Sequence, residues 1–384
     1  MKWLVLLGMV IASSIAMPSP NVAFAQTQPR FVLGFKTLAD MIPKVVGKPL
    51  ESEHFDPLRG DALQKTTRGL LVWRKIDNWS AFTDGSTTWI NGPHGLQERP
   101  NGQRFPWESQ STEAAAPSIR CGPPGPDYYE PCLFTDQYGG SMNFFLYVPP
   151  SVDPNQLYPL VLVLHGGGER PKPGMTPAEG DALLEGASYV RCWVGGATHL
   201  GEASVQSRWP SYVVVPQLDG NSKWVDVPPW HGSYHLAPQP TSELRMAKEI
   251  VDFLQQKFTN VDPNRLYIAG VSLGGYGTWD AIERWPGYFA AAVPVSGAGD
   301  PSRANELKDM PIWAFHGADD QTVPVSGSRG MIGAIRAAGG KPRYTEYPDG
   351  KHVIWVTAFN VDVPSADNIF QWLFAQRKPG PDQP

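Results

Sequence analysis

Residues 265–274 read Arg-Leu-Tyr-Ile-Ala-Gly-Val-Ser-Leu-Gly, and this stretch decides the fold. Leu266 to Ala269 form a short apolar run typical of a buried strand, which leads directly into the pattern Gly-x-Ser-x-Gly. Glycine at the flanks lets two backbone segments approach at a distance that a Cβ atom would block. Such a turn between strand and helix holds the hydroxyl of Ser272 above the sheet, at the N-terminus of the helix that follows. The pattern therefore predicts a nucleophilic serine.

A serine hydroxyl needs a base and a group that orients this base, and two later segments contain candidates. Residues 311–315 are an apolar run of strand character, and the loop after them contains Asp319 and Asp320. Asp320 is the better candidate for the orienting carboxylate. Residues 343–347 alternate as in a strand and are followed by His352. The order Ser, Asp, His at strand ends fits a catalytic triad. The alternatives are aspartates that only cap a turn and a histidine that only lies on the surface.

A continuous apolar run at residues 158–164 predicts a strand buried on both faces of a parallel sheet. It ends in His165-Gly166-Gly167-Gly168, where glycines let backbone amides turn inward without obstruction by side chains. A loop at this position donates half of an oxyanion hole, and the amide after the serine donates the other half. We therefore expect the amides of Gly167 and Leu273 to bind an oxyanion. The alternative is a glycine-rich exit from the strand without a catalytic role.

From Asn143 to Gln376 the chain resembles the secreted bacterial esterases and predicted peptidases of the α/β-hydrolase superfamily. This group is related to polyhydroxybutyrate depolymerases, feruloyl esterases and, more distantly, prolyl-oligopeptidase catalytic domains. The resemblance is carried by residues 158–170, 270–280, 289–297, 311–325 and 344–355. It implies an α/β-hydrolase fold in which Ser272, Asp320 and His352 form the triad. It is specific for the catalytic machinery but not for the substrate, because this fold supports many reactions.

We accordingly expect a serine hydrolase that cleaves carboxylic esters through an acyl-enzyme, with feruloyl, acetyl or polyester substrates derived from a polymer. A serine peptidase of the prolyl-oligopeptidase type is the alternative. A polymer-binding protein without catalysis is a third reading, against which the three intact triad residues argue. Most of the 14 tryptophans are expected in the core. Near the substrate we expect His165, together with Trp224 and Trp230, which follow the strand-like run at residues 212–216, and Trp355, three residues after His352. Indole rings suit the apolar faces of saccharides.

Alternating strand and helix patterns over residues 118–378 predict a mostly parallel sheet with helices on both faces, which is the hydrolase domain. Thr241 or Ser242 is expected to cap the clearest helix, because a hydroxyl can accept the free amides of a first turn. The expected helices are residues 243–258, 277–284, 326–338 and 366–376. A domain of this length can bury one large core.

Residues 26–112 have a different pattern and are expected to form a small β-rich N-terminal module. Short strand-like runs occur at residues 69–73 and 87–90, and turn residues such as Asn, Asp and Gly separate them. The module ends at a polar, alanine-rich linker near residues 109–117. It either binds a surface polymer or packs on the catalytic domain.

Residues 1–25 combine a basic start, an apolar stretch and an Ala-x-Ala pattern, which together predict a secretory signal peptide. The protein is therefore expected in the periplasm or outside the cell, without a membrane span in its mature form. In such an oxidising compartment Cys121 and Cys132 are expected to form a disulfide across a Pro/Gly loop. Cys192 is expected to be a buried apolar residue and not a nucleophile.

The net charge of −5 and the absence of a basic run argue against nucleic acid as a partner. His231 and His235 have the i, i+4 spacing of a helical metal pair, but prolines at 228, 229 and 238 make that segment a loop. No metal and no cofactor is therefore expected. The partner that remains is an ester substrate.

Overall fold

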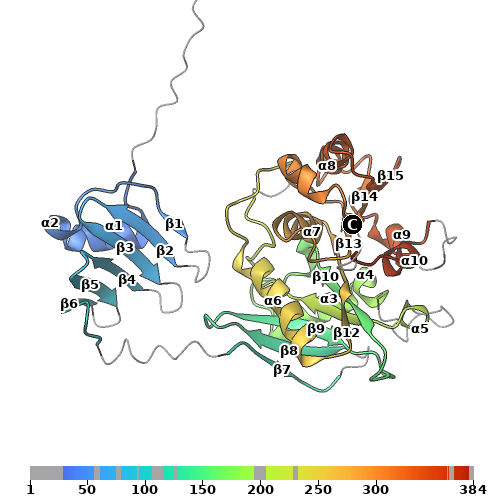
Figure 1. Ribbon diagram of the computed structural model, residues 1–384, viewed down its shortest axis with the longest axis horizontal. Helices are drawn as coiled ribbons and strands as arrows, with labels where there is room; N and C mark the ends of the chain where they lie inside the picture. The colour runs from blue at the N-terminus through green and yellow to red at the C-terminus, as the bar shows by residue number, and fades with distance from the viewer. Residues whose placement is uncertain are drawn as a thin grey trace, which may run out of the picture. The chain divides into compact units, whose positions relative to one another are not determined.

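The computed structural model describes residues 29–55, 61–74, 79–92, 95–105, 116–124, 129–193, 205–227, 232–360, 362 and 367–379. The predicted signal peptide, Trp230 and His231 lie outside the described residues. The chain divides into two compact units, with the main boundary between residues 101 and 102. Each unit contains its own β-sheet (Figure 1).

The N-terminal unit is a six-stranded sheet in which the strands lie in sequence order from β1 to β6. The pairs β2–β3, β4–β5 and β5–β6 are antiparallel, as expected for neighbouring strands joined by short turns. The elements are α1 Leu33–Met41, α2 Pro43–Val46, β1 His54–Phe55, β2 Ala62–Thr66, β3 Gly69–Arg74, β4 Trp79–Thr83, β5 Thr87–Gly92 and β6 Gly95–Pro100. The two strand-like runs of the sequence thus form β3 and β5, as predicted.

Helix α1 was not predicted, although its sequence carries the signal. Four of the buried residues of this segment recur at the spacing i, i+3, i+4, i+7, which places them on one helical face: Phe35, Leu38, Ala39 and Ile42. They share an apolar cluster with residues of the sheet, among them Leu71 and Phe82. The module is therefore β-rich, as predicted, with helical residues packed on its sheet around one small core.

The second unit is a nine-stranded mixed sheet with the order β15-β14-β13-β12-β10-β11-β9-β8-β7. All neighbours from β15 to β11 are parallel, and the three remaining strands continue the sheet in antiparallel pairs. The strands are β7 Ser118–Cys121, β8 Glu130–Thr135, β9 Ser141–Tyr147, β10 Tyr158–Leu164, β11 Tyr212–Pro216, β12 Val261–Val271, β13 Ala291–Val295, β14 Trp313–Gly317 and β15 Arg343–Tyr347. The mostly parallel sheet is confirmed.

Strand β10 shows why both faces of this sheet are covered. Side chains alternate between the two faces of a strand, and all seven residues of β10 are buried. Leu160, Leu162 and Leu164 belong to one apolar cluster, whereas Val161 and Val163 belong to a second. The first cluster includes residues of α6 (Ser242–Lys257), α7 (Leu273–Arg284) and α8 (Ser326–Ala337). The second includes residues of α4 (Ser188–Arg191), α5 (Val205–Arg208) and α10 (Ile369–Phe374). The result is a three-layer arrangement with the sheet in the middle.

The four predicted helices of this unit are present as α6, α7, α8 and α10 and differ from the prediction at their ends, whereas its other helices were not predicted. They are η1 Gly167–Glu169, α3 Pro177–Gly186, α4 Ser188–Arg191, α5 Val205–Arg208, α6 Ser242–Lys257, α7 Leu273–Arg284, η2 Pro301–Leu307, α8 Ser326–Ala337, α9 Trp355–Ala358 and α10 Ile369–Phe374. Thr241 caps α6, where its side chain accepts a hydrogen bond from the amide of Leu244 at 3.1 Å. Helix α7 begins four residues earlier than predicted, directly after Ser272.

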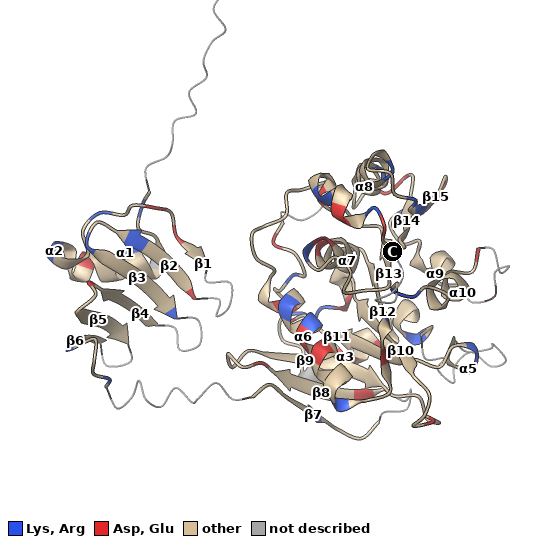
Figure 2. Cartoon of the chain, viewed as in Figure 1, with Lys and Arg blue, Asp and Glu red and all other residues tan. Residues whose placement is uncertain are grey.

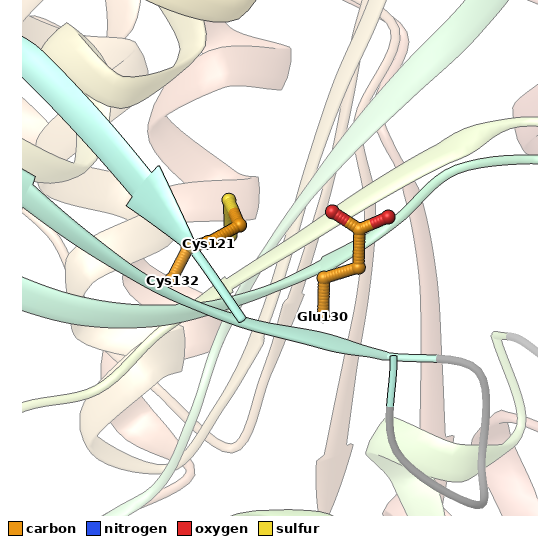
Figure 3. A group of neighbouring side chains, drawn as sticks. All are labelled: Cys121, Glu130 and Cys132. Carbon is orange, nitrogen blue, oxygen red and sulfur yellow. A yellow bond between two sulfur atoms is a disulfide. The ribbon is translucent and has the colours of Figure 1, made fainter. Parts of the chain in front are cut away.

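Cys121 and Cys132 are joined by a disulfide that links the paired strands β7 and β8. With Glu130 they form a group that could hold a metal ion, the one such group among the described residues. Figure 3 shows the three side chains together. Because the two sulfurs are bonded to each other, they offer no thiolate ligands. Cys192 keeps a free thiol, and burial raises its pKa, so it is a poor nucleophile.

Charged side chains of both signs are interspersed on the second unit (Figure 2). On α6, Arg245 pairs with Glu249 at 2.8 Å and Lys248 pairs with Asp252 at 2.7 Å, both one helical turn apart. No helix within the described ranges is long and apolar enough to cross a bilayer.

Candidate active site

Ser272 lies in the sharp turn between β12 and α7, in the backbone conformation φ 53°, ψ −115°. Positive φ is rare for residues other than glycine and costs of the order of 1–3 kcal/mol. The neighbouring glycines permit the turn, because a Cβ atom on Gly274 would lie 1.9 Å from the carbonyl oxygen of Leu164. A Cβ atom on Gly270 would lie 2.2 Å from the carbonyl oxygen of Gly274. The hydroxyl is thereby held at the end of the sheet, although the residue is only 4% exposed.

The structure brings His352 between Ser272 and Asp320. Its Nε2 lies 2.8 Å from Ser272 Oγ, and its Nδ1 lies 2.7 Å from Asp320 Oδ2. The three residues follow β12, β15 and β14, so three strand ends meet at one edge of the sheet. The backbone fits closely there, since a Cβ atom on Gly317 would lie 2.3 Å from the carbonyl oxygen of Gly350.

Asp320 accepts hydrogen bonds on both carboxylate oxygens. Oδ1 accepts from the amides of Thr322 and Val323, each at 2.8 Å. Oδ2 accepts from His352 and also lies 3.2 Å from Nε2 of His316. Burial acts to raise the pKa of Asp320, but the hydrogen bonds from His316, His352 and the two amides outweigh it and lower the pKa well below its usual range. The carboxylate is therefore ionised.

Asp319, the other aspartate considered from the sequence, is exposed. Its Oδ1 accepts a hydrogen bond from Gln321 at 2.8 Å, and its amide donates to the carbonyl oxygen of Gly350 at 2.9 Å. It therefore stabilises the loop, whereas Asp320 holds the imidazole.

Two residues of this site were missed from the sequence. His316 is fully buried in β14 and binds Asp320, and its position at a strand end four residues before Asp320 could have indicated this. Ser296 follows β13 with φ 49°, and its hydroxyl donates to the carbonyl oxygen of His352 at 3.1 Å. Nothing in the sequence around Ser296 distinguishes it from an ordinary turn serine. It anchors the loop that carries the imidazole.

The glycine-rich loop after β10 lies against the serine. A Cβ atom on Gly166 would be 3.5 Å from Cβ of Ser272, and the amide of Gly166 donates to the hydroxyl of Tyr189 at 3.1 Å. Gly167 and Leu273 are the first residues of η1 and α7. The first amides of a helix have no acceptor within that helix, which fits the expected oxyanion hole, and their binding of an oxyanion stays a prediction.

His165 and Trp224 do not lie where we expected them. Both are 0% exposed, so neither can contact a substrate without a rearrangement of the core. The indole of Trp224 donates to the carbonyl oxygen of His165 at 2.9 Å, and Nε2 of His165 accepts from the amide of Leu218 at 3.0 Å. Burial lowers the pKa of His165 to about 4, which keeps the ring neutral. His165 and Trp224 therefore stabilise the start of the glycine-rich loop from the interior. The prediction that they bind substrate is wrong.

Trp355 lies beside the imidazole, as expected for a residue of the cleft. Its ring centroid is 5.4 Å from that of His352 and 6.1 Å from that of Tyr189, both in edge-to-face geometry. It is half-buried, so part of the indole is open to a ligand. Contact with substrate stays a prediction for this residue.

The proline-containing loop that follows the glycines lines a separate cavity of about 310 Å³. It is lined by residues that include Pro171, Met175, Asp181, Gln217 and Glu243. Ser272, Asp320 and His352 are not among its lining residues. Gln217 of this cavity also contacts the end of the glycine-rich loop, because its side chain donates to the carbonyl oxygen of Glu169 at 3.2 Å. The candidate triad therefore lies outside this cavity.

Comparison with known proteins gives one family and several distant relatives. The Esterase family, described as putative esterases, matches residues 135–355. A bifunctional acetylxylan esterase/xylanase of Neocallimastix patriciarum is 23% identical over 51% of this chain and 24% of its own length. A probable carboxylesterase of Arabidopsis thaliana is 23% identical over 34% of this chain and 53% of its own length. The chain thus spans only about a quarter to a half of these relatives.

Among solved structures, a thermostable esterase is 27% identical, with a TM-score of 0.49 and coverage of 85% of this chain and 76% of that chain. The six parallel strands, the helices on both faces and the sharp turn at Ser272 are those of an α/β-hydrolase. With more than half of its length matched, the chain belongs to the Esterase family of this superfamily.

Proposed function

We propose that this protein is a carboxylic ester hydrolase in which Ser272 is the nucleophile, His352 the base and Asp320 the orienting carboxylate. The observation that carries the proposal is the continuous hydrogen-bonded chain between them, 2.8 Å from Ser272 to His352 and 2.7 Å from His352 to Asp320. Ionised Asp320 can only accept at Nδ1, so this nitrogen carries a hydrogen and Nε2 is left with its lone pair toward the hydroxyl. This is the tautomer that a general base requires.

In the first half of the reaction the hydroxyl oxygen of Ser272 attacks the ester carbonyl carbon while its proton moves to Nε2 of His352. Asp320 stabilises the imidazolium that forms. The amides of Gly167 and Leu273 bind the oxyanion, which is where we place the largest electrostatic contribution. The imidazolium then gives its proton to the alkoxide leaving group, and an acyl-serine remains.

In the second half water attacks the acyl-serine, with His352 again as the base. Proton transfer back to Ser272 Oγ releases the carboxylic acid and restores the starting state. Splitting the reaction in this way predicts a burst of alcohol release that equals the concentration of active sites. We propose that Trp355, whose ring lies beside the imidazole, forms part of the wall of the substrate cleft.

The substrate class we propose is an acetyl, feruloyl or polyester-type ester linked to a polymer. The sequence resemblance to feruloyl esterases and polyester depolymerases supports it, and so does the relative named as an acetylxylan esterase. Export through a signal peptide at residues 1–25 fits a substrate that cannot enter a cell. We further propose that residues 26–112 and 118–378 act as an accessory module and a catalytic domain.

The test is an assay of the full secreted chain on p-nitrophenyl acetate, methyl ferulate and a proline-containing peptide anilide. We expect ester turnover with a burst, and a loss of about 10³-fold or more in kcat in Ser272→Ala. The matched control is Ser302→Ala, whose hydroxyl donates a hydrogen bond to Asp300 at the start of η2 and whose loss should leave turnover unchanged. Turnover that survives Ser272→Ala contradicts the assignment.

The same assay separates the alternatives. Faster cleavage of the peptide anilide than of either ester would make the protein a peptidase, and a distant relative named dipeptidyl-peptidase 4, from Giardia intestinalis, is 21% identical over 60% of this chain. No turnover of any substrate, with retained binding to insoluble polysaccharide, would make it a binding protein.

A further inference from the structure

His316 is a second histidine on the carboxylate that orients His352. It is fully buried in β14, and its Nε2 lies 3.2 Å from Asp320 Oδ2 and 3.1 Å from the carbonyl oxygen of Val323. A carbonyl oxygen and an ionised carboxylate can only accept hydrogen bonds. Nε2 of His316 must therefore carry a hydrogen, which it donates to Val323, with Oδ2 of Asp320 as a second acceptor at 3.2 Å.

The other ring nitrogen keeps this donation independent of the charge of the ring. Nδ1 lies 2.7 Å from Oγ of Ser328, and this hydroxyl also lies 3.1 Å from the carbonyl oxygen of Gly297. If the hydroxyl donates to Nδ1, the imidazole is neutral; if it donates to Gly297, Nδ1 can be protonated as well. In both states the hydrogen on Nε2 stays in place.

Oδ2 of Asp320 is thus shared between two imidazole N–H groups, from His352 at 2.7 Å and from His316 at 3.2 Å. Each donor stabilises the carboxylate charge and makes the same oxygen a weaker partner for the other donor. A weaker bond to Asp320 stabilises the imidazolium form of His352 less. His352 then stays neutral, and able to accept a proton, at lower pH.

We propose, on the basis of the proposed function, that His316 is a positioning residue that holds Asp320. By sharing the Oδ2 oxygen of Asp320, it lowers the basicity of His352. This extends the pH range of ester hydrolysis toward acid. His316 does not touch the substrate, since it is fully buried and acts through Asp320.

Other charged groups lie around the network of His316, Asp320 and His352 and also affect its pH dependence. Glu346 of β15 is the strand partner of His316, and Arg329 of α8 pairs with it at 2.6 Å. Tyr276 of α7 has a raised pKa, mainly because it is buried and also because the negative charge of Asp320 is near. Its hydroxyl is therefore neutral. Two further charged side chains of the same loops are exposed, namely Asp319 and Lys351. The carboxylate of Asp320 is therefore the group that His316 modulates most directly.

The test compares His316→Asn with His316→Gln. The amide nitrogen of glutamine reaches the position of Nε2, whereas that of asparagine reaches only the position of Nδ1, so one variant keeps the donor and the other loses it. We expect the acid limb of the kcat/KM profile to move up by about 0.5 to 1 pH unit in His316→Asn and to stay near the original value in His316→Gln. Far-ultraviolet circular dichroism and thermal melting establish that both variants are folded.

Glu346→Gln is the electrostatic control. It removes a negative charge near the network but no hydrogen bond to Asp320, so any shift of the acid limb should be toward lower pH, opposite to that of His316→Asn. The proposal is overturned if His316→Asn loses activity at every pH with an unmoved limb, or if both His316 variants shift equally. Either result would give His316 a merely structural role.

Nitrogen NMR of the histidines of the unmodified protein tests the idea without mutation and without turnover. We expect Nε2 of His316 to stay protonated from about pH 5 to 9, across the range in which an ordinary histidine titrates. An unprotonated Nε2 overturns the proposal. Absence of ester turnover, or turnover that persists in Ser272→Ala, would instead refute the proposed function, while the pKa of His352 in the two variants can still be measured by NMR.

Discussion

Replacement of Asp320 by asparagine should reverse the tautomer of the base. The amides of Thr322 and Val323 donate to Oδ1, so the introduced amide keeps its oxygen on that side. Its NH₂ group then takes the place of Oδ2 and points at His352 and His316. Two donors cannot face each other, so Nδ1 of His352 must become the acceptor and its hydrogen moves to Nε2. An Nε2 that carries a hydrogen cannot take the proton of Ser272.

The expected loss in kcat is about 10⁴-fold, the size seen when a triad carboxylate becomes an amide, or about 5 kcal/mol of transition-state stabilisation. KM should change much less, because Asp320 is buried behind the imidazole and does not face the substrate. Initial rates on p-nitrophenyl acetate across pH measure both constants. Asp319→Asn is the matched control, and because this side chain is exposed we expect about the original activity.

The reasoning is refuted if Asp320→Asn retains a tenth or more of the original kcat, or if Asp319→Asn is the inactive variant. Stability gives an independent readout. The pKa of Asp320 is lowered in the folded state, so its contribution is complete above the unfolded value near 3.8 and is lost as pH falls below it toward the folded pKa. Acid unfolding of the asparagine variant should lack this component, and urea melts at several pH values measure it.

Gly274→Ala should abolish soluble folding or activity, because its methyl group would lie 1.9 Å from a backbone oxygen of β10, and circular dichroism with an ester assay checks this. Glu283→Gln should raise the melting temperature more at pH 8 than at pH 4.5: burial raises the pKa of this carboxyl, so the folded protein loses stability as pH rises above the unfolded value. Equal shifts at the two pH values would contradict it. Reduction of the bond between Cys121 and Cys132 should lower stability by about 2–3 kcal/mol, as melts with and without dithiothreitol would show. Trp355→Ala should raise KM for esters of aromatic acids, such as methyl ferulate, more than for acetate esters. A change in kcat alone would contradict a position of Trp355 in the substrate cleft.

Much of the second unit could be predicted because its signals are local. The alternation of Leu and Val in β10 predicts a strand buried on both faces, and the glycines around Ser272 are required by the turn itself. The chain order of Ser272, Asp320 and His352 follows from the strands that precede them. These features depend on neighbours in the sequence, so a single sequence contains them.

The misses share a different cause. Helix α7 begins at Leu273 despite three glycines in its first turns, since close packing on β10 and β13 replaces the helix propensity that glycine lacks. His165 and Trp224 have the composition of a binding site, but their burial depends on elements more than 50 residues apart in sequence. Helix α1 was missed because it is short and begins after Val32, which provides no side-chain cap that would mark its start.

By itself, the sequence determined the order of the strands that precede the site, the strained serine turn and the identity of the three candidate triad residues, because short-range periodicity and steric limits on the backbone act within a few residues. Tertiary structure alone decided that His316 lies against the carboxylate of Asp320 and that His165 and Trp224 are buried in the interior. The physical reason is that hydrogen-bond geometry and exposure are set by side chains from distant strands, which meet only when the sheet is assembled.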